Sequence, residues 1–217
     1  MVESGNRPLV RWRKADQVTT FNLNDYDFDA IIFDCDGTIA DTLPVHFLTF
    51  KEALAEQGQV LTSEWYYART GLSSSKLFDA YEKAFDVTLD RAALLARCRV
   101  LYEAHLDVLR EHSFTAEIAR SHFGHVPMAV ASAGLKSIVT ATLRTLDLLE
   151  LFDCVVTVED VTHPKPAPDL YLLAASKLGV TPSRCLVFED TEEGLEAAHN
   201  AGMRAVDVRP HLTIDER

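Results

Sequence analysis

Short apolar runs alternate with longer amphipathic stretches along much of the sequence, and this pattern restricts the fold more than any other feature. The apolar runs are residues 30–33, 128–131, 154–158, 185–188 and 205–208. Each run is almost continuously apolar, which is typical of strands that are covered on both faces. We therefore expect these runs to form one sheet in the interior of the protein.

Helical patterns separate the later runs. They cover residues 137–149, 169–178 and 192–201, and Gly179 and Gly202 stand just past the last two, where helix ends favour glycine. Strands that alternate with helices form parallel sheets with helices on both faces. The sequence therefore predicts a Rossmann-like α/β fold with three layers: helices, a parallel sheet and helices.

Residues 44–115 interrupt this alternation. They contain no convincing strand but several helical stretches, such as residues 92–110. We predict that this insertion forms an α-helical cap domain, and that residues 28–43 and 116–217 form the α/β core. Residues 1–27 are polar and mixed, and we expect them to form an N-terminal extension packed loosely on the core.

The formal net charge of −12 argues against a broad nucleic-acid interface, because such an interface needs a basic face. A small anionic substrate is still compatible, since a metal and a few local cations can override the overall field. No apolar run is long enough to span a membrane, and the N-terminus lacks the apolar stretch of a secretory signal. We expect a cytoplasmic protein without a membrane partner.

Two carboxylates follow the first apolar run directly. Asp34 and Asp36 are only two positions apart, and charges this close repel each other unless a cation lies between them or one is protonated. Gly37 and Thr38 then turn the chain. Taken alone, a solvated Asp-Gly turn explains this segment about as well as a catalytic or metal site does.

Other polar residues follow later apolar runs. Ser132 precedes a helix, which suits phosphate binding, although a plain N-cap serine explains that residue better on its own. Lys165 lies between prolines on a stiff loop, either as a fixed cation for a phosphate oxygen or as a surface lysine. Glu189 and Asp190 suit a Mg²⁺ site, or a helix start whose dipole they complement.

These segments are more informative together than singly. An aspartate pair, a serine, a lysine and an acidic pair follow one another at successive predicted strand ends. The carboxyl ends of parallel strands meet at the edge of the sheet where ligands bind. Since a chance arrangement of all four is improbable, we predict a single site at that edge.

The same segments resemble the four motifs of the haloacid dehalogenase-like (HAD) superfamily. They are Asp34-Cys35-Asp36-Gly37-Thr38, Ser132, KPAPD from Lys165 and FEDTEEG from Phe188. The insertion after the first motif is similar to the cap of subfamily I, and KPAPDLYLLAASKLGV and VFEDTEEGLEAAHNAGM are similar to the β-phosphoglucomutase-like branch. Within that branch the chain looks most similar to bacterial sugar phosphatases that act on fructose-1-phosphate and 6-phosphogluconate.

The resemblance implies a role for each core residue. Asp34 would be the nucleophile that carries the phosphoryl group. Asp36 would act first as general acid and then as general base. Ser132, the backbone N–H of Ala133 and Lys165 would hold the phosphoryl group.

The resemblance also implies Mg²⁺ as the cofactor. Its ligands would be the carboxylates of Asp34 and Asp190 and the backbone carbonyl of Asp36, with Glu189 in or next to the coordination sphere. This arrangement is physically reasonable, because phosphoryl transfer depends mostly on positioning and charge neutralisation. A carboxylate can approach an anionic phosphate only where cations cancel the repulsion.

In the cap, the resemblance implies that His46 engages the acid–base aspartate and that Gly71 belongs to the substrate loop. Thr70 and Ser74 stand where mutases have a lysine and an arginine for a second phosphate, and Lys76 is a possible replacement. Because a mutase must hold a bisphosphate intermediate, the loss of these cations favours simple hydrolysis.

We therefore predict a Mg²⁺-dependent phosphatase that hydrolyses a small phosphorylated sugar or sugar acid through an aspartyl-phosphate intermediate. β-Phosphoglucomutase activity is the main alternative. Dehalogenation of 2-haloacids is disfavoured because it has no role for a second aspartate and Mg²⁺, and a non-catalytic binding protein would not need the complete motif set. We expect a monomer or a small homo-oligomer.

Overall fold

The computed structural model describes residues 21–212, which form two compact units. One unit contains residues 47–101 and is helical, and the other contains the remaining described residues and the sheet. Residues 1–20 of the predicted extension lie outside the described residues. Phe21, which follows them, belongs to the unit with the sheet and packs edge-on against Phe114 at a centroid distance of 5.2 Å.

A five-stranded sheet in the order β5-β4-β1-β6-β7 forms the centre of its unit, and every pairing is parallel. The strands are β1 (Ala30–Phe33), β4 (Met128–Ser132), β5 (Cys154–Thr157), β6 (Cys185–Glu189) and β7 (Arg204–Asp207). Each agrees with a predicted apolar run to within about one residue at either end. The prediction of a parallel sheet is confirmed.

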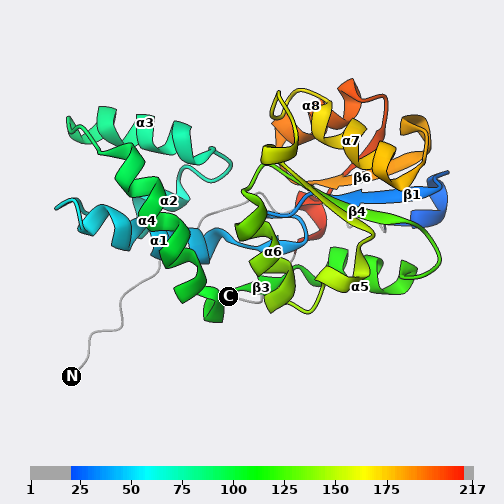
Figure 1. Ribbon diagram of the computed structural model, residues 1–217, viewed down its shortest axis with the longest axis horizontal. Helices are drawn as coiled ribbons and strands as arrows, with labels where there is room; N and C mark the ends of the chain where they lie inside the picture. Colours follow the sequence, from blue (N-terminus) through cyan, green and yellow to red (C-terminus); the bar gives the residue numbers. More distant parts are fainter. Residues whose placement is uncertain (1–20, 213–217) are drawn as a thin grey trace. The chain divides into compact units, whose positions relative to one another are not determined.

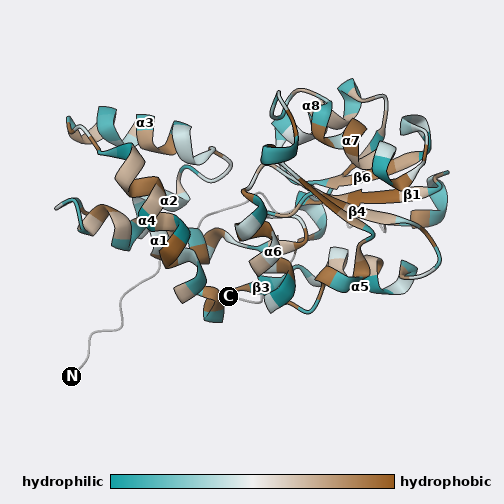
Figure 2. Ribbon diagram, viewed as in Figure 1, coloured by the Kyte–Doolittle hydropathy of each residue, from teal (hydrophilic) through white to brown (hydrophobic). Residues whose placement is uncertain are grey.

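Helices cover both faces of the sheet, with α5 and α6 on one face and α7 and α8 on the other (Figure 1). These helices are α5 (Ser113–His122), α6 (Lys136–Thr145), α7 (Asp169–Leu178) and α8 (Glu192–Asn200). Along β1, Ile31 and Phe33 pack in the core with α5 and α6, whereas Ala30 and Ile32 pack with α7 and α8. The strands are hydrophobic and the helices are mixed (Figure 2), as three layers require.

Local sequence signals explain several helix ends. Gly179 (φ +71°) ends α7 in the left-handed conformation, as predicted. The Thr191 side chain caps α8 by accepting a hydrogen bond from the Gly194 N–H at 3.1 Å. Helix α6 ends at Thr145, earlier than the predicted residue 149, because Asp147 has a left-handed backbone (φ +54°) that a helix does not accommodate.

The direction in which successive strands are added to the sheet reverses at β1. The chain passes from β1 to its neighbour β4 and on to β5, and then crosses by way of α7 to β6 on the other side of β1. Where the connections from two adjacent strands run in opposite directions, ligands bind at the carboxyl ends of those strands. Asp34, Ser132 and Glu189 stand at the carboxyl ends of β1, β4 and β6.

The other unit is built from helices, as expected for the insertion. They are α1 (Leu43–Ala55), α2 (Ser63–Tyr67), α3 (Ser74–Phe85) and α4 (Arg91–Ala104), and one end of α1 and of α4 belongs to the unit with the sheet. Phe50 and Phe78 are buried and pack edge-on at 5.3 Å. Within residues 21–212, no helix has both the length and the apolar character needed to cross a membrane.

The division into units differs from the predicted cap boundaries of 44 and 115. Residues 102–115 belong to the unit with the sheet. The helix predicted for residues 92–110 is too long, since α4 ends at Ala104 and Arg110 instead starts a short strand. That strand, β3 (Arg110–Glu111), pairs antiparallel with β2 (Ala40–Asp41), which ties the segment to the core. The extent of the cap as a functional domain stays a prediction.

Short 3₁₀ helices complete the connections. They are η1 (Leu23–Asp25), η2 (Leu106–Val108), η3 (Leu149–Leu151), η4 (Val158–Asp160), η5 (Pro182–Arg184) and η6 (Arg209–His211).

Candidate active site

Asp34 lies just beyond β1, at the centre of the carboxyl edge of the sheet. Its N–H donates to the carbonyl of Phe188 on β6 at 3.0 Å, which continues the parallel pairing past the strand end. The residue is 5% exposed, so it is not a solvated turn aspartate. Its Oδ1 accepts a hydrogen bond from Lys165 Nζ at 2.6 Å.

The turn that follows is shaped around Asp190. Gly37 has a left-handed backbone (φ +85°), and a Cβ at this position would lie 2.4 Å from Asp190 Oδ2. Thr38 Oγ1 donates to Asp190 Oδ1 at 3.0 Å, and Thr115 Oγ1 donates to the Thr38 carbonyl at 2.6 Å. The turn therefore needs glycine both for its conformation and for the space that the Asp190 carboxylate occupies.

Asp36 contacts Ser132 and His46. Ser132 Oγ donates to Asp36 Oδ2 at 3.2 Å and accepts from the Gly134 N–H at 2.9 Å. His46 Nε2 lies 3.5 Å from Asp36 Oδ1. Burial raises the pKa of Asp36, but hydrogen bonds from His46 and other neighbours outweigh it and bring the pKa below its ordinary value. Asp36 is therefore ionised near neutral pH.

Ser132 is not the N-cap of the following helix. It is fully buried at the end of β4, and α6 begins only at Lys136. Ala133 lies in the same loop, between Ser132 and Gly134. The Ser132 hydroxyl thus points to Asp36 instead of capping a helix.

Lys165 is buried between two carboxylates. Its Nζ donates to Asp34 Oδ1 at 2.6 Å and to Glu189 Oε2 at 2.7 Å, and its side chain is 6% exposed. Burial alone would lower the pKa of Lys165, but the surrounding negative charges hold it well above its ordinary value. Lys165 is therefore a fixed cation and not a surface lysine.

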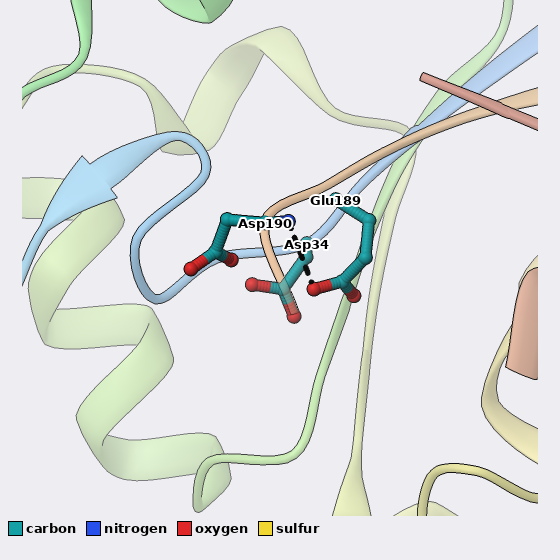
Figure 3. Close-up of side chains that lie close together, drawn as sticks. All are labelled: Asp34, Glu189 and Asp190. Carbon is teal, nitrogen blue, oxygen red and sulfur yellow. Dashed lines mark hydrogen bonds between the residues drawn. The ribbon is translucent and has the colours of Figure 1, made fainter. Parts of the chain in front are cut away.

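Asp34, Glu189 and Asp190 form an acidic cluster in which each offers an oxygen within 4.8 Å of the others. In Figure 3, the Asp34 carboxylate lies between those of Asp190 and Glu189. Burial and the charge of Glu189 raise the pKa of Asp34 well above its ordinary value and that of Asp190 to about 7. A divalent cation beside this cluster would relieve the repulsion, and carboxylate oxygens are the ligands that a hard metal ion prefers.

The structure brings the predicted core residues together at one sheet edge. Thr70, Gly71 and Lys76, which were predicted to act in the cap, lie in the helical unit, in the loop before α3 and in its first turn. Gly71 is exposed and has a left-handed backbone (φ +87°), which explains the glycine. The roles of these cap residues stay predictions.

Some contacts within the site were not predicted from the sequence. Thr38 orients Asp190, as described above. The N–H and Oγ1 of Thr191 donate to Glu189 Oε1 at 2.9 and 2.8 Å, and the Tyr171 hydroxyl donates to Glu189 Oε2 at 2.7 Å. The sequence offered one indication of the Tyr171 contact. Tyr171 lies in an otherwise apolar stretch of its helix, and a buried tyrosine hydroxyl needs a hydrogen-bond partner.

Comparison with known proteins identifies the family. Residues 31–208 match the haloacid dehalogenase-like hydrolases. The chain belongs to this family. The superfamily and fold predicted from the motifs are therefore confirmed, and the site described above lies in an enzyme of the HAD type.

Several relatives resemble this HAD hydrolase over most of its length. Fructose-1-phosphate phosphatase YqaB of Escherichia coli is 37% identical over 182 residues, covering 84% of this chain and 97% of that protein. The β-phosphoglucomutase of Bacillus subtilis is 29% identical over 198 residues, covering 86% and 87%. The structure of CbbY from Rhodobacter sphaeroides with phosphate has a TM-score of 0.71 at 27% identity, covering 82% and 84%. A mutant of CbbY has been solved with xylulose-(1,5)bisphosphate.

Proposed function

We propose that this HAD hydrolase is a Mg²⁺-dependent phosphatase that acts on a small phosphorylated sugar, with Asp34 as the nucleophile. The proposal rests on one observation above all: Asp34 and Lys165 form a buried pair beside a second acid, Asp36. The relatives support the substrate class, since one is named a fructose-1-phosphate phosphatase and another was solved with a sugar bisphosphate. We further propose a cytoplasmic enzyme that works as a monomer or a small homo-oligomer.

In the first step, the Asp34 carboxylate attacks phosphorus, and the bond between phosphorus and the sugar oxygen breaks. Lys165, Ser132 Oγ and the backbone N–H of Ala133 bind the phosphoryl oxygens and offset their charge. Asp36 protonates the leaving sugar oxygen. Because Asp36 is ionised at rest, it must first take up a proton, and an anionic phosphate beside it raises its proton affinity.

In the second step, water attacks the phosphorus of phosphoryl-Asp34. Asp36, ionised after the first step, accepts the proton from that water. Inorganic phosphate leaves, Asp34 regains its carboxylate, and Asp36 releases the proton to solvent and returns to its ionised resting form. His46 contacts one carboxylate oxygen of Asp36 and keeps it oriented in both steps. Ser132 donates to the other oxygen before substrate binds and turns its single O–H to the phosphoryl group when substrate is present.

We propose Asp34, Asp190 and the backbone carbonyl of Asp36 as the Mg²⁺ ligands. When bound, Mg²⁺ supplies positive charge that offsets the repulsion between a carboxylate and an anionic phosphate. Thr38 holds Asp190 by its Oδ1, and Lys165 holds Asp34 by its Oδ1. Both ligands are therefore oriented by this chain before any metal binds.

Phosphoryl transfer between sugar hydroxyls, as in β-phosphoglucomutase, is the second candidate. The contact between His46 and Asp36 and the Bacillus subtilis relative favour it. Thr70 and Ser74 weigh against it, because they replace the cations that a bisphosphate intermediate requires at its second end. Water is therefore the preferred acceptor of the phosphoryl group in this proposal.

A panel of phosphorylated sugars, assayed for phosphate release with and without Mg²⁺, tests the proposal. We expect Mg²⁺-dependent release from at least one sugar monophosphate. Glucose-1-phosphate with a bisphosphate primer should yield no glucose-6-phosphate. Formation of that isomer would favour the mutase, and a complete lack of release across the panel would refute the phosphatase.

A further inference from the structure

The Glu189 carboxylate is completely occupied by hydrogen-bond donors from the protein. Its Oε1 accepts from the Asp190 N–H at 3.0 Å and from the N–H and Oγ1 of Thr191 at 2.9 and 2.8 Å. Its Oε2 accepts from Lys165 Nζ and the Tyr171 hydroxyl, both at 2.7 Å. Glu189 is also fully buried. A carboxylate in this condition has few lone pairs left for a metal ion.

The backbone around Glu189 is built to hold it in place. A Cβ at Gly194, in the first turn of α8, would lie 1.9 Å from Glu189 Oε2. Thr191, which donates to Oε1, also caps α8 by accepting from the Gly194 N–H. Movement of the carboxylate towards a cation would therefore leave the buried Tyr171 hydroxyl and the two donors of Thr191 without their partner.

Asp190 differs from its neighbour in this respect. Among residues 21–212, its carboxylate accepts one side-chain hydrogen bond, from Thr38 to Oδ1. The other oxygen faces Gly37. Of the two adjacent acids, Asp190 therefore has a carboxylate oxygen available to bind a metal ion, and Glu189 does not.

Tyr171 connects Glu189 to Lys165 in two ways. It is fully buried on α7, and its hydroxyl donates to the same Oε2 that accepts from Lys165 Nζ. The Lys165 ammonium also lies 4.9 Å from the centre of the Tyr171 ring, a cation–π contact. The hydroxyl stays protonated, since burial and the nearby Glu189 raise the pKa of Tyr171 well above its ordinary value.

We propose that Tyr171 is a positioning residue that locks Glu189 as the anchor of Lys165, and that Glu189 is not a ligand of the metal. The Lys165 ammonium keeps one bond to this anchor and directs another to Asp34. The proposal deepens the phosphatase function proposed above and rests on it for the kinetic measurements.

Tyr171→Phe tests the proposal, because it removes the hydroxyl and keeps the ring. Tyr81→Phe is the matched control, since Tyr81 is a buried tyrosine whose hydroxyl donates to the Val60 carbonyl at 2.9 Å in the helical unit. We expect Tyr171→Phe to lower kcat by about tenfold and to leave the Mg²⁺ dissociation constant, measured by calorimetry, within about twofold of the wild type. Tyr81→Phe should leave both values unchanged.

Two results would overturn the proposal. One is a kcat for Tyr171→Phe that equals that of the control. The other is a Mg²⁺ dissociation constant that changes by more than about fivefold, since a released Glu189 would then be acting on the metal. Combining Tyr171→Phe with Glu189→Gln adds a further criterion. If Tyr171 acts through Glu189, the loss of kcat in the double variant should be smaller than the two single losses combined. Additive losses of kcat would show that the two residues act independently.

Binding measurements separate this proposal from the proposed function. Inorganic phosphate should bind to Tyr171→Phe about fivefold more weakly than to the wild type, whether or not a sugar phosphate is hydrolysed. If Tyr171→Phe does not fold, a comparison of Glu189→Gln with Asp190→Asn shows which of the two acids binds Mg²⁺. The two variants are matched because each removes one negative charge. Mg²⁺ affinity should fall at least about tenfold further in Asp190→Asn, and equal losses would make Glu189 a ligand.

Discussion

The carboxyl edge of the sheet and the loop before α3 hold their polar residues in different ways. At the sheet edge, the side chains of Lys165 and Glu189 are buried, and Lys165 donates hydrogen bonds both to Glu189 and to Asp34. In the loop, Gly71 and Ser73 are exposed. A change at the edge disturbs several partners together, whereas a change in the loop leaves the packing intact. We therefore expect the edge to determine the reaction and the loop to affect which substrate is accepted.

The largest effect is expected from Asp34→Asn. The amide has nearly the shape of the carboxylate but is not a nucleophile, so phosphate release should fall by roughly four orders of magnitude or more. Steady-state kinetics on the best sugar phosphate measures this, and circular dichroism should show an unchanged fold. Asp107→Asn, at an exposed position outside the site, serves as the control and should be fully active. A substantially active Asp34→Asn would show that the edge does not determine the reaction as proposed.

The acidic cluster should make Mg²⁺ binding depend on pH. Burial and the charge of Glu189 raise the pKa of Asp190 to about 7, and Asp190 must lose its proton to bind the metal. Mg²⁺ affinity should therefore fall by about tenfold for each pH unit below 7. Calorimetric titrations between about pH 6 and pH 8 measure this. Asp190→Asn should lose the part of the dependence that Asp190 contributes and keep the part due to Asp34, whose pKa is also raised. An affinity independent of pH would rule out Asp190 as a titrating ligand.

The raised pKa of Asp190 also determines how the stability of the metal-free protein changes with pH. Folded protein keeps a proton on Asp190 above the ordinary pKa of 3.8, whereas unfolded protein loses it there. Raising the pH from about 4 to about 7 should therefore lower this residue's contribution to the free energy of unfolding. Urea unfolding of the wild type and of Asp190→Asn across that range isolates the contribution. If the wild type instead became more stable relative to Asp190→Asn as the pH rises, the raised pKa of Asp190 would be contradicted.

Gly194→Ala tests how closely the edge is packed. The new methyl would lie 1.9 Å from Glu189 Oε2, so the carboxylate or α8 must move. We expect the free energy of unfolding to fall by about 1–3 kcal/mol, as is typical of overpacked sites. Gly134→Ala provides a graded comparison, because its methyl would lie 3.0 Å from Val139 Cγ2 and should cost less. Equal losses in both variants would mean that Glu189 is not held as tightly as described.

The smallest effect on the reaction is expected from the loop. Thr70→Lys combined with Ser74→Arg restores the cations that mutases carry, and should change kcat/KM for a sugar monophosphate by less than about tenfold. Inhibition by a sugar bisphosphate should become about tenfold stronger, because charge-assisted hydrogen bonds to the second phosphate become available. Lys76→Gln is a control for charge in the same region. Loss of hydrolysis in the double variant would contradict the separation between edge and loop.

Much of the core was predictable from the sequence because buried parallel strands leave a local signature. The run that forms β1 is continuously apolar, and the chemistry-bearing residues Asp34, Ser132 and Glu189 stand at the ends of such runs. Once the strands were assigned as parallel, the topology required these residues to meet at one edge. Their proximity was therefore a consequence of fold class and did not depend on any single motif.

The rest depended on contacts that the local pattern does not encode. The helix predicted for residues 92–110 ends at Ala104, and the chain beyond it forms β3, which pairs with β2 through residues far apart in the sequence. The bond from Thr115 to Thr38 and the bond from Tyr171 to Glu189 also join different elements. Periodicity places a residue on a helix face, but the partner of a buried hydroxyl becomes known only when the neighbouring element is in place.

The central claim is that the phosphoryl group passes through Asp34. Rapid acid quenching during turnover of a radiolabelled sugar phosphate with Mg²⁺, followed by digestion and mass spectrometry, tests this directly. We expect a labelled peptide that carries the phosphoryl group on Asp34 and forms and decays at rates consistent with kcat. Turnover with no labelled protein at any quench time, or with the label on another residue, would contradict it.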